Sequence, residues 1–248
     1  MPIQQMMLGL GGEASDITWS NLVLYLDAGK NNSYSGSGTT WSDLTSGNHD
    51  ATLIHSPTYS STSGGGSFTF DGTNDYATIP DATDFLFGTG DYTEEAWYKR
   101  TSTSGEEVVI ERGNSSSWQG TRMDELIPKP KAYTESTGSI EVSQTNAITA
   151  QGYDWFYSVF TKSGNSTQYR KFYFNSTWVV TNINSSISGW QPKGTSVSSD
   201  YNLHIAGADS SKRFTGEIAI IRIYKGKALS QSEITQHYNA EKSRFGHS

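Results

Sequence analysis

Phe214-Thr-Gly-Glu-Ile-Ala-Ile-Ile-Arg-Ile-Tyr224 is the stretch of this sequence that decides its fold. Apolar side chains occupy both faces of this run, which predicts a central strand over Glu217–Tyr224. The chain continues as Lys225-Gly-Lys-Ala-Leu-Ser230 and Gln231-Ser-Glu-Ile-Thr-Gln-His-Tyr238. Here Ser230 and Glu233 form a capping box, and Leu229 and Ile234 form the hydrophobic staple that accompanies it. We therefore predict a buried strand, a short connection and one helix that begins after Ser230.

Short apolar runs recur along the rest of the chain and are separated by turn residues such as Gly64-Gly65-Gly66. Their spacing is typical of antiparallel strands. We predict strands over Leu22–Ala28, Ala51–Ile54, Ser67–Asp71, Asp75–Ile79, Tyr92–Arg100, Glu107–Arg112, Ser139–Ser143, Trp155–Lys162, Gln168–Phe174, Thr177–Val180, Asn202–Ala206 and Glu217–Tyr224. The pattern predicts an all-β fold: a sandwich of two antiparallel sheets with one short C-terminal helix.

The segment from Ser115 to Asp154 has the least regular pattern. Pro128 and Pro130 argue against a central strand there, because proline cannot donate to a sheet ladder. We expect an irregular excursion, which is either an insertion over a sheet edge or a binding loop.

Three stretches together resemble the laminin-G-like, concanavalin A-like lectin/glucanase jelly-roll superfamily. Phe70-Asp-Gly-Thr-Asn-Asp-Tyr76 is similar to its F-D-G-x-x-D-Y motif, and Tyr92-Thr-Glu-Glu-Ala-Trp-Tyr-Lys99 is similar to its F-T-I-x-A-W-V-K strand. The run from Phe214 to Tyr238 is similar to the strand and helix that close the family's domain. The resemblance implies a two-sheet jelly roll over nearly the whole chain. It leaves the function open, since one sandwich hosts many functions.

Composition limits the classes of function. The 248 residues suit an N-terminal arm over residues 1–20 and one jelly-roll domain over residues 21–248. A net charge of −7 argues against nucleic-acid binding, and the absence of cysteine excludes disulfides and thiolate chemistry. No apolar run reaches the roughly 20 residues that span a bilayer. The N-terminus also lacks the basic stretch of a secretory signal, so we expect neither membrane insertion nor export by that route.

The sequence gives no sign of an enzyme. Glucanase relatives carry E-x-D-x-x-E, which places two carboxylates about one sugar bond. Here the acidic pairs Glu94-Glu95 and Glu106-Glu107 are adjacent, so on a strand their side chains point to opposite faces. The histidines show no metal-ligand spacing: His49, His55, His204, His237 and His247. We therefore predict a protein without catalytic residues and without a required cofactor.

Calcium is the one metal that the resemblance suggests. Laminin-G-like domains often bind calcium through Asp, Asn and backbone oxygens, the hard ligands that Ca²⁺ prefers. Asp71, Asn74 and Asp75 form such a cluster, and Asp27 lies in a weaker one. The competing interpretation is turn chemistry, in which Asp and Asn side chains bond their own backbone. Ala219 and Ile220 stand where the family often has acids, which argues against an acidic site near the last strand.

Sugar binding would require exposed aromatic rings. Trp118, Trp178 and Trp190 lie in or beside loop-like sequence and are the candidates, whereas Trp97 and Trp155 are expected in the core. Packing in the core or at an interface is the competing interpretation for each indole. Glu94 stands where the family has an apolar residue. Because a buried unpaired carboxylate is costly, we expect Glu94 to face solvent or a neighbouring subunit.

The N-terminal arm carries the apolar residues Met6, Met7, Leu8 and Leu10 among glycines. It is either a frayed tail or a docking peptide whose methionines adapt to another surface. Its first nine residues resemble the M-x-I-Q-Q-x-x-L-G run that begins many bacteriophage tail and capsid-surface proteins. The resemblance implies a virion structural protein, assembled in the host cytoplasm and released by lysis. Its partners would be other virion proteins, further copies of itself and a host surface glycan; the alternative is a free carbohydrate-binding lectin module, assisted or not by calcium.

Overall fold

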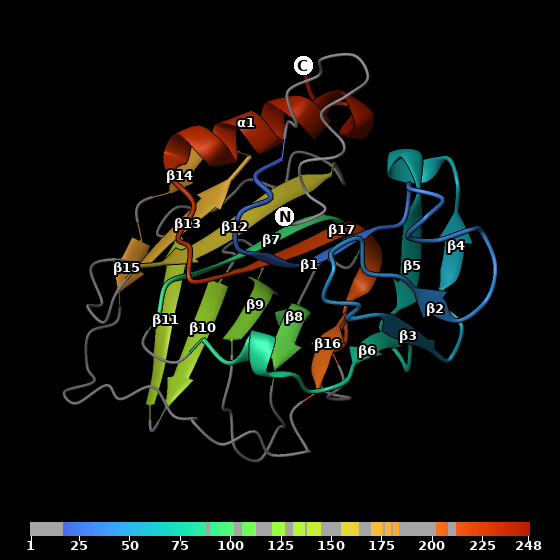
Figure 1. Cartoon of the computed structure of the whole chain (residues 1–248), viewed down its shortest axis with the longest axis horizontal. Coiled ribbons are helices and arrows are strands. Elements are labelled where there is room, and N and C mark those ends of the chain that lie inside the picture. Colours follow the sequence, from blue (N-terminus) through green and yellow to red (C-terminus); the bar gives the residue numbers. More distant parts are fainter. Residues whose placement is uncertain are drawn as a thin grey trace, which may run out of the picture.

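The computed structural model describes residues 17–248 except 88–89, 102–105, 113–120, 127–130, 137, 145–154, 164–169, 176, 180, 184–201 and 208–211. The N-terminal residues Met6, Met7, Leu8 and Leu10 therefore lie outside the described part of the chain. In that part the strands form two antiparallel sheets, and the long helix α1 (Gln231–Glu241) lies across one of them (Figure 1). The predicted two-sheet sandwich with one C-terminal helix is confirmed.

Sheet A carries the helix. Its strand order is β14 (Thr177–Val179), β13 (Arg170–Phe174), β12 (Phe156–Lys162), β7 (Tyr92–Arg100), β17 (Thr215–Lys225), β5 (Ser67–Asp71) and β4 (Thr58–Ser60). Strand β1 (Leu22–Asp27) pairs with the second half of β17, where Leu26 lies opposite Ile221. Strand β17 thus has β7 on one side and both β5 and β1 on the other, which makes it the central strand that the sequence predicted.

Sheet B forms the other layer. Its order is β15 (Thr181–Ile183), β11 (Gly138–Gln144), β10 (Lys131–Ser136), β9 (Thr121–Leu126), β8 (Glu106–Arg112), β16 (Leu203–Ile205), β6 (Tyr76–Ile79), β3 (Ala51–Ile54) and β2 (Thr40–Trp41). Short 3₁₀ helices η2 (Ser63–Gly65), η3 (Thr83–Phe85) and η5 (Lys242–Phe245) are also present in the described part of the chain. No helix of the described residues is both long and apolar enough to cross a membrane.

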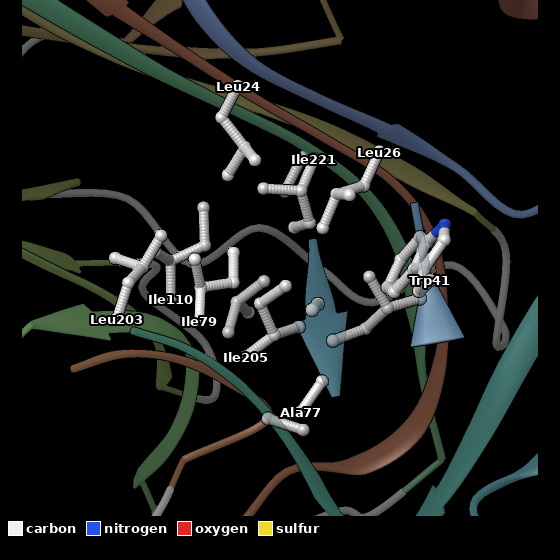
Figure 2. Packing of buried hydrophobic residues seen from close by; sticks show 14 of the residues in the cluster. Leu24, Leu26, Trp41, Ala77, Ile79, Ile110, Leu203, Ile205 and Ile221 are labelled. Carbon is white, nitrogen blue, oxygen red and sulfur yellow. The ribbon is translucent and has the colours of Figure 1, made fainter. Parts of the chain in front are cut away.

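Two hydrophobic cores follow from this three-layer arrangement. The first lies between the sheets and includes Leu24, Leu26, Ile110, Ile205 and Ile221 (Figure 2). The second lies between sheet A and the C-terminal helices. Its members come from both sides of that contact: Tyr25, Trp97, Trp155, Tyr157, Val159, Tyr173, Ala219, Ile220, Tyr224, Leu229, Ile234 and Phe245. Sheet A is therefore buried on both faces, which explains why β17 is apolar all round.

Helix α1 begins as predicted. The Ser230 hydroxyl accepts the Glu233 N–H, and the Glu233 carboxylate accepts the Ser230 N–H at 2.9 Å. Leu229 and Ile234 are both buried in the second core, which confirms the staple. The helix continues three residues beyond the predicted Tyr238, and this last turn brings Glu241 over sheet A.

The segment from Ser115 to Asp154 corrects the sequence analysis. It holds β9 and β10, two strands in the middle of one half of sheet B, as well as the predicted β11. Pro128 and Pro130 fall between β9 and β10 in the sequence and lie outside the described residues, so the argument from proline does not apply to the strands themselves. The prediction of an irregular excursion was therefore wrong over these strands. The short strands β2, β4 and β15 were also missed, because two or three residues carry no pattern of their own.

Glu94 also departs from expectation. It is fully buried in β7, where it lies opposite Phe160 of β12 and Ile223 of β17, both members of the first core. The prediction that it faces solvent or another subunit was wrong. Its neighbour Glu95 points to the opposite face of β7, toward α1, as the alternation of a strand requires.

Candidate functional site

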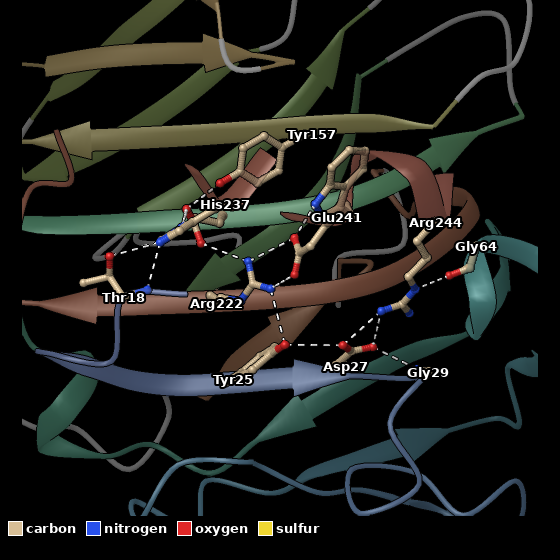
Figure 3. A network of polar contacts seen from close by, with 12 residues as sticks. Thr18, Tyr25, Asp27, Gly29, Gly64, Tyr157, Arg222, His237, Glu241 and Arg244 are labelled. Carbon is tan, nitrogen blue, oxygen red and sulfur yellow. Dashed lines mark hydrogen bonds and ion pairs between the residues drawn. The ribbon is translucent and has the colours of Figure 1, made fainter. Parts of the chain in front are cut away.

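A network of charged and polar side chains lies between sheet A and α1 (Figure 3). Its centre is Arg222 of β17, which is fully buried. The guanidinium donates to Glu95 of β7 at 3.3 Å and to Glu241 of α1, with which it forms a close ion pair. It also lies over the Tyr25 ring, 4.5 Å from the centroid. One cation thus joins two strands and the helix.

Glu95 is held by three donors. Tyr157 donates its hydroxyl to Oε1 at 2.6 Å, Arg222 donates to Oε2, and Nδ1 of His237 lies 2.9 Å from Oε1. Burial by itself raises the pKa of Glu95, but His237, Arg222 and Tyr157 outweigh that effect and hold the pKa below its usual value. The carboxylate is therefore charged at neutral pH although it is fully buried.

The network continues from Arg222 in two directions. Trp97 donates its indole N–H to Glu241 Oε2 at 2.7 Å. On the other side, the Tyr25 hydroxyl lies 3.4 Å from Asp27, and Asp27 pairs with Arg244 at 2.8 Å. Asp27, a member of the weaker predicted calcium cluster, is thus committed to an ion pair with the C-terminal 3₁₀ helix η5.

These contacts decide what the network can do chemically. Glu95 and Glu241 converge, but they converge on the Arg222 guanidinium beneath a helix rather than on an accessible cleft. A carboxylate that is neutralised and sealed in this way cannot reach a glycosidic bond. The network instead fastens α1 and η5 to sheet A. Among the described residues, α1 lies on sheet A and not on the outward face of sheet B.

The predicted calcium cluster forms a tight turn between β5 and β6. Asp71 Oδ1 accepts the backbone N–H groups of Thr73, Asn74 and Asp75 at 2.8, 3.1 and 3.2 Å. These bonds, that from Thr73 above all, lower the pKa of Asp71. Burial, and then the charge of Asp71, raise the pKa of Asp75. Arg213 donates to the Asn74 carbonyl at 3.3 Å, so a cation already lies beside this turn.

No three His, Cys, Asp or Glu side chains of the described residues are placed to hold a metal ion. The ligand set expected for calcium also includes Asn74 and backbone oxygens, so calcium binding at Asp71, Asn74 and Asp75 stays a prediction.

The tryptophan candidates are mostly beyond the described structure. Trp118 and Trp190 lie outside the described residues, and Trp178 belongs to β14, at one edge of sheet A and opposite Tyr173. Their role in sugar binding stays a prediction. Trp97 and Trp155 are buried in the second core, as expected.

The outward face of sheet B carries an aromatic and polar cluster that the sequence analysis did not single out. Tyr76 lies at its centre: the Arg213 guanidinium is 5.1 Å from its ring, and the rings of His204 and His55 are 5.8 and 6.4 Å away. Next to it, Thr52, Thr78, His204 and Glu111 lie side by side on four neighbouring strands. We name Tyr76, His204, His55 and Arg213 the Tyr76 cluster. Strand alternation would place Tyr76 and His204 on an outward face, but the contact of their rings across β6 and β16 is not visible in one sequence.

His204 gives the Tyr76 cluster a pH dependence that can be measured. Burial, and then the charge of Arg213, lower the pKa of His204 to about 4, whereas a histidine in the unfolded chain titrates near ~6.5. The contribution of the neutral ring to stability is therefore full above about pH 6.5 and is lost as the pH falls toward about 4. His204→Gln is expected to reduce the loss of stability between pH 7 and 5 by about 1–2 kcal/mol in urea denaturation. His55→Gln, at an exposed ring, is the matched control; an unchanged pH profile in His204→Gln would contradict the assignment.

A family model described as the concanavalin A-like lectin/glucanases superfamily matches residues 71–235, which is more than half of the chain. The chain belongs to this superfamily. No curated protein sequence matches it at a significant level.

Several solved structures share this fold at low sequence identity. The binding domain of Paraclostridial Mosquitocidal Protein 1 aligns with a TM-score of 0.66 and 12% identity over 92% of this chain and 55% of that one. The binding domain of botulinum neurotoxin DC, solved in complex with SialylT, gives 0.64 and 12% over 89% of this chain and 52% of that one. This superfamily member thus spans about half the length of the toxin binding domains it matches.

Domain 4 of AbnA, a GH43 extracellular arabinanase from Geobacillus stearothermophilus solved with arabinotriose, gives a TM-score of 0.65 and 16% identity. There the match covers 88% of this chain and 98% of that one, so the two domains correspond over nearly their whole lengths. At these identities the likeness shows a shared lectin-like fold and nothing of the ligand.

Proposed function

We propose that this chain is a non-catalytic, lectin-like binding domain displayed on a bacteriophage virion. The observation that carries the proposal is the closed face of sheet A. Helix α1 covers this face, and Glu95 of the sheet and Glu241 of the helix both form ion pairs with Arg222. With this face closed, we expect binding through the outward surfaces and loops of the domain.

The setting on a virion is supported by the N-terminal sequence. Residues 1–9 resemble the first residues of phage tail and capsid-surface proteins, and the apolar arm with Met6 and Met7 needs a partner surface. Another virion protein or a second copy of the chain would supply that surface, and symmetric assemblies commonly do so. Within this proposal, capsid decoration and tail adhesion are alternative roles.

Virion display has a direct test. A tagged full-length chain produced during phage growth is expected to copurify with particles in a density gradient. A copy that lacks residues 1–16 is expected to stay in the soluble fraction, and it keeps Thr18, which contacts His237 of α1. Full-length protein that also remains soluble would overturn the virion role.

A glycan is the ligand class that the outward face of sheet B favours. The Tyr76 ring offers a stacking surface, and Arg213, His204 and the threonines around it offer polar groups for sugar hydroxyls. The same reasoning supports the second candidate function, a free carbohydrate-binding module that uses this face without a particle.

Glycan binding predicts a loss on a single substitution. On a glycan array, wild-type protein is expected to retain at least one glycan class, and Tyr76→Ala is expected to weaken that binding roughly tenfold or more. Trp19→Ala removes an exposed aromatic ring, 43% accessible, that packs on Tyr25 of sheet A, so it serves as the control and is expected to bind normally. Binding that survives Tyr76→Ala would move the ligand away from this face, and an empty array would remove the glycan from the proposal.

A further inference from the structure

Two polar atoms on the outward face of sheet B are buried and have no hydrogen-bond partner among the described residues. They are Nδ1 of His204 in β16 and Oγ1 of Thr78 in β6. The two residues lie directly opposite each other in the antiparallel pair, so their side chains leave the sheet side by side on one face. Because a buried polar atom without a partner is costly, two such atoms together point to one external group that bonds both.

The pair lies where the face of sheet B changes from open to closed. Thr52 of β3, the neighbour of Thr78, is exposed. Glu111 of β8 lies opposite His204 on the other side and is only 3% exposed. Between them Thr78, His204 and Tyr76 are half-buried. A ligand therefore reaches the pair over β3 and β6, where the Tyr76 ring lies two residues from Thr78 on the same face.

The hydrogen-bonding capacity of the pair matches a hydroxyl group. Burial, and then the charge of Arg213, lower the pKa of His204 to about 4, so the ring is neutral at pH 7. Nδ1 of a neutral ring either donates or accepts according to the tautomer, and the Thr78 hydroxyl can do both. A ligand hydroxyl also does both and fits either tautomer, whereas a carboxylate only accepts and an ammonium group only donates.

The charges around the pair favour a ligand without a carboxylate. Glu111 lies opposite His204, and Asp75, next to Tyr76 in the chain, is also buried. Arg213 carries a positive charge, but its guanidinium already donates to the Asn74 and Gly207 carbonyls at 3.3 Å each. A carboxylate on the ligand would be repelled by two buried carboxylates. A neutral sugar avoids that cost.

Two turns beside the Tyr76 cluster are held in an unfavourable backbone conformation. His55 and Ser56, which follow β3, have φ of 63° and 72°, and Ala206, which follows β16, has φ of 67°. Residues other than glycine seldom adopt this left-handed conformation, and where they do the surrounding structure fixes it, often at a ligand site. The His55 ring lies 6.4 Å from that of Tyr76. The surroundings of the pair are thus set by the fold before a ligand arrives.

We propose that Nδ1 of His204 and Oγ1 of Thr78 together bind one hydroxyl group of a neutral sugar whose ring lies against Tyr76. The inference rests on the proposed glycan binding and gives it a chemical class: neutral sugars rather than uronic or sialic acids. The pair also sets specificity within that class, because a site that bonds a hydroxyl discriminates against an analogue that lacks it.

Calorimetric titration with methyl glycosides tests the pair. Wild-type protein is expected to bind at least one of the methyl glycosides of glucose, galactose, mannose and arabinose, and to bind those of glucuronic and galacturonic acid more weakly. Thr78→Val keeps the shape of threonine but removes the hydroxyl, so it is expected to weaken the tightest of these interactions roughly tenfold. Thr69→Val, at an exposed position on sheet A, is the matched control and is expected to bind normally.

Two substitutions of His204 distinguish its ring nitrogens. The amide of glutamine lies near the position of Nε2, whereas the amide of asparagine lies near that of Nδ1. His204→Gln is therefore expected to weaken binding roughly tenfold, and His204→Asn is expected to recover most of that loss. A residue that only supports the fold would not show this order. Urea denaturation of each variant separates folding from binding, and if His204→Gln unfolds, Thr78→Val decides alone.

Failure of the pair and failure of the proposed function give different results. If wild-type protein binds none of these glycosides and no glycan on an array, glycan binding is refuted and the pair with it. If Tyr76→Ala abolishes binding while Thr78→Val and His204→Gln bind as the wild type does, the face binds sugar without the pair, and only this inference is refuted. Tighter binding of the acidic glycosides would refute the neutral class.

Discussion

Replacing Arg222 by methionine is expected to lower the free energy of unfolding by about 3–5 kcal/mol, because it leaves buried carboxylates without a counter-ion. Glu95 and Glu241 both depend on this guanidinium, and Glu95 is fully buried. Methionine retains much of the volume of arginine, so the loss reports charge rather than a cavity. Urea denaturation at pH 7, followed by tryptophan fluorescence, measures the change.

Lys99→Met is the matched control for this change. Lys99 lies 4.0 Å from Glu217, and both side chains are partly exposed, so removing that pair is expected to cost no more than about 1 kcal/mol. Adding Glu95→Gln to Arg222→Met removes one of the stranded charges and is expected to recover part of the loss. If Arg222→Met lowered the free energy of unfolding by less than about 1 kcal/mol, the network would contribute no more to stability than an ion pair on the surface.

The pH dependence of stability under acidic conditions gives a second test of Arg222→Met. The pKa of Glu95 is below its usual value in the folded protein, so the stability it contributes is full above the unfolded pKa of about 4.3 and is lost as the pH falls through the folded value. In Arg222→Met the buried carboxylates no longer carry an unpaired charge once they are protonated. The difference from wild type is therefore expected to narrow below about pH 4.

Short sequence patterns predicted the elements whose conformation depends mainly on residues close in sequence. The run before Tyr224 has apolar residues on both faces, and the Ser230 capping box needs only four residues to be read, so both were predictable. Strands β9 and β10 are different. They carry polar sequences, Thr121-Arg-Met-Asp-Glu-Leu126 and Lys131-Ala-Tyr-Thr-Glu-Ser136, and are strands because β8 and β11 pair with them. Propensity is overridden there by tertiary pairing.

The buried polar groups were beyond sequence reasoning for a related reason. A single sequence shows that a buried carboxylate is costly, but not that Arg222, Tyr157 and His237 converge on Glu95 from three separate elements. The same reasoning misplaced Glu94, since it assumed that cost forces exposure. The contact of Thr18 with His237 and the Tyr76 cluster likewise depend on how distant elements pack, which no local pattern encodes.

Trp97→Ala is expected to be as damaging as the loss of Arg222, by about 3–5 kcal/mol, because it empties the middle of the second core. Trp97 is fully buried in β7. Its ring stacks on Phe245 at 4.1 Å, on Tyr157 at 5.0 Å and on Tyr238 at 5.8 Å between centroids. One indole thus contacts sheet A, α1 and η5 at once, so its removal loosens the whole C-terminal layer.

Trp97→Phe separates the two contributions of the indole. It keeps an aromatic ring in the stack but removes the N–H that Glu241 accepts at 2.7 Å, and it is expected to cost about 1–3 kcal/mol. Trp19→Ala, at an exposed ring, is expected to cost less than about 1 kcal/mol. Chemical denaturation ranks the three variants. If Trp97→Ala were no worse than Trp19→Ala, the C-terminal layer would not be anchored through this side chain.

Because Glu241 also pairs with Arg222, Trp97→Ala combined with Arg222→Met is expected to cost less than the sum of the two single changes.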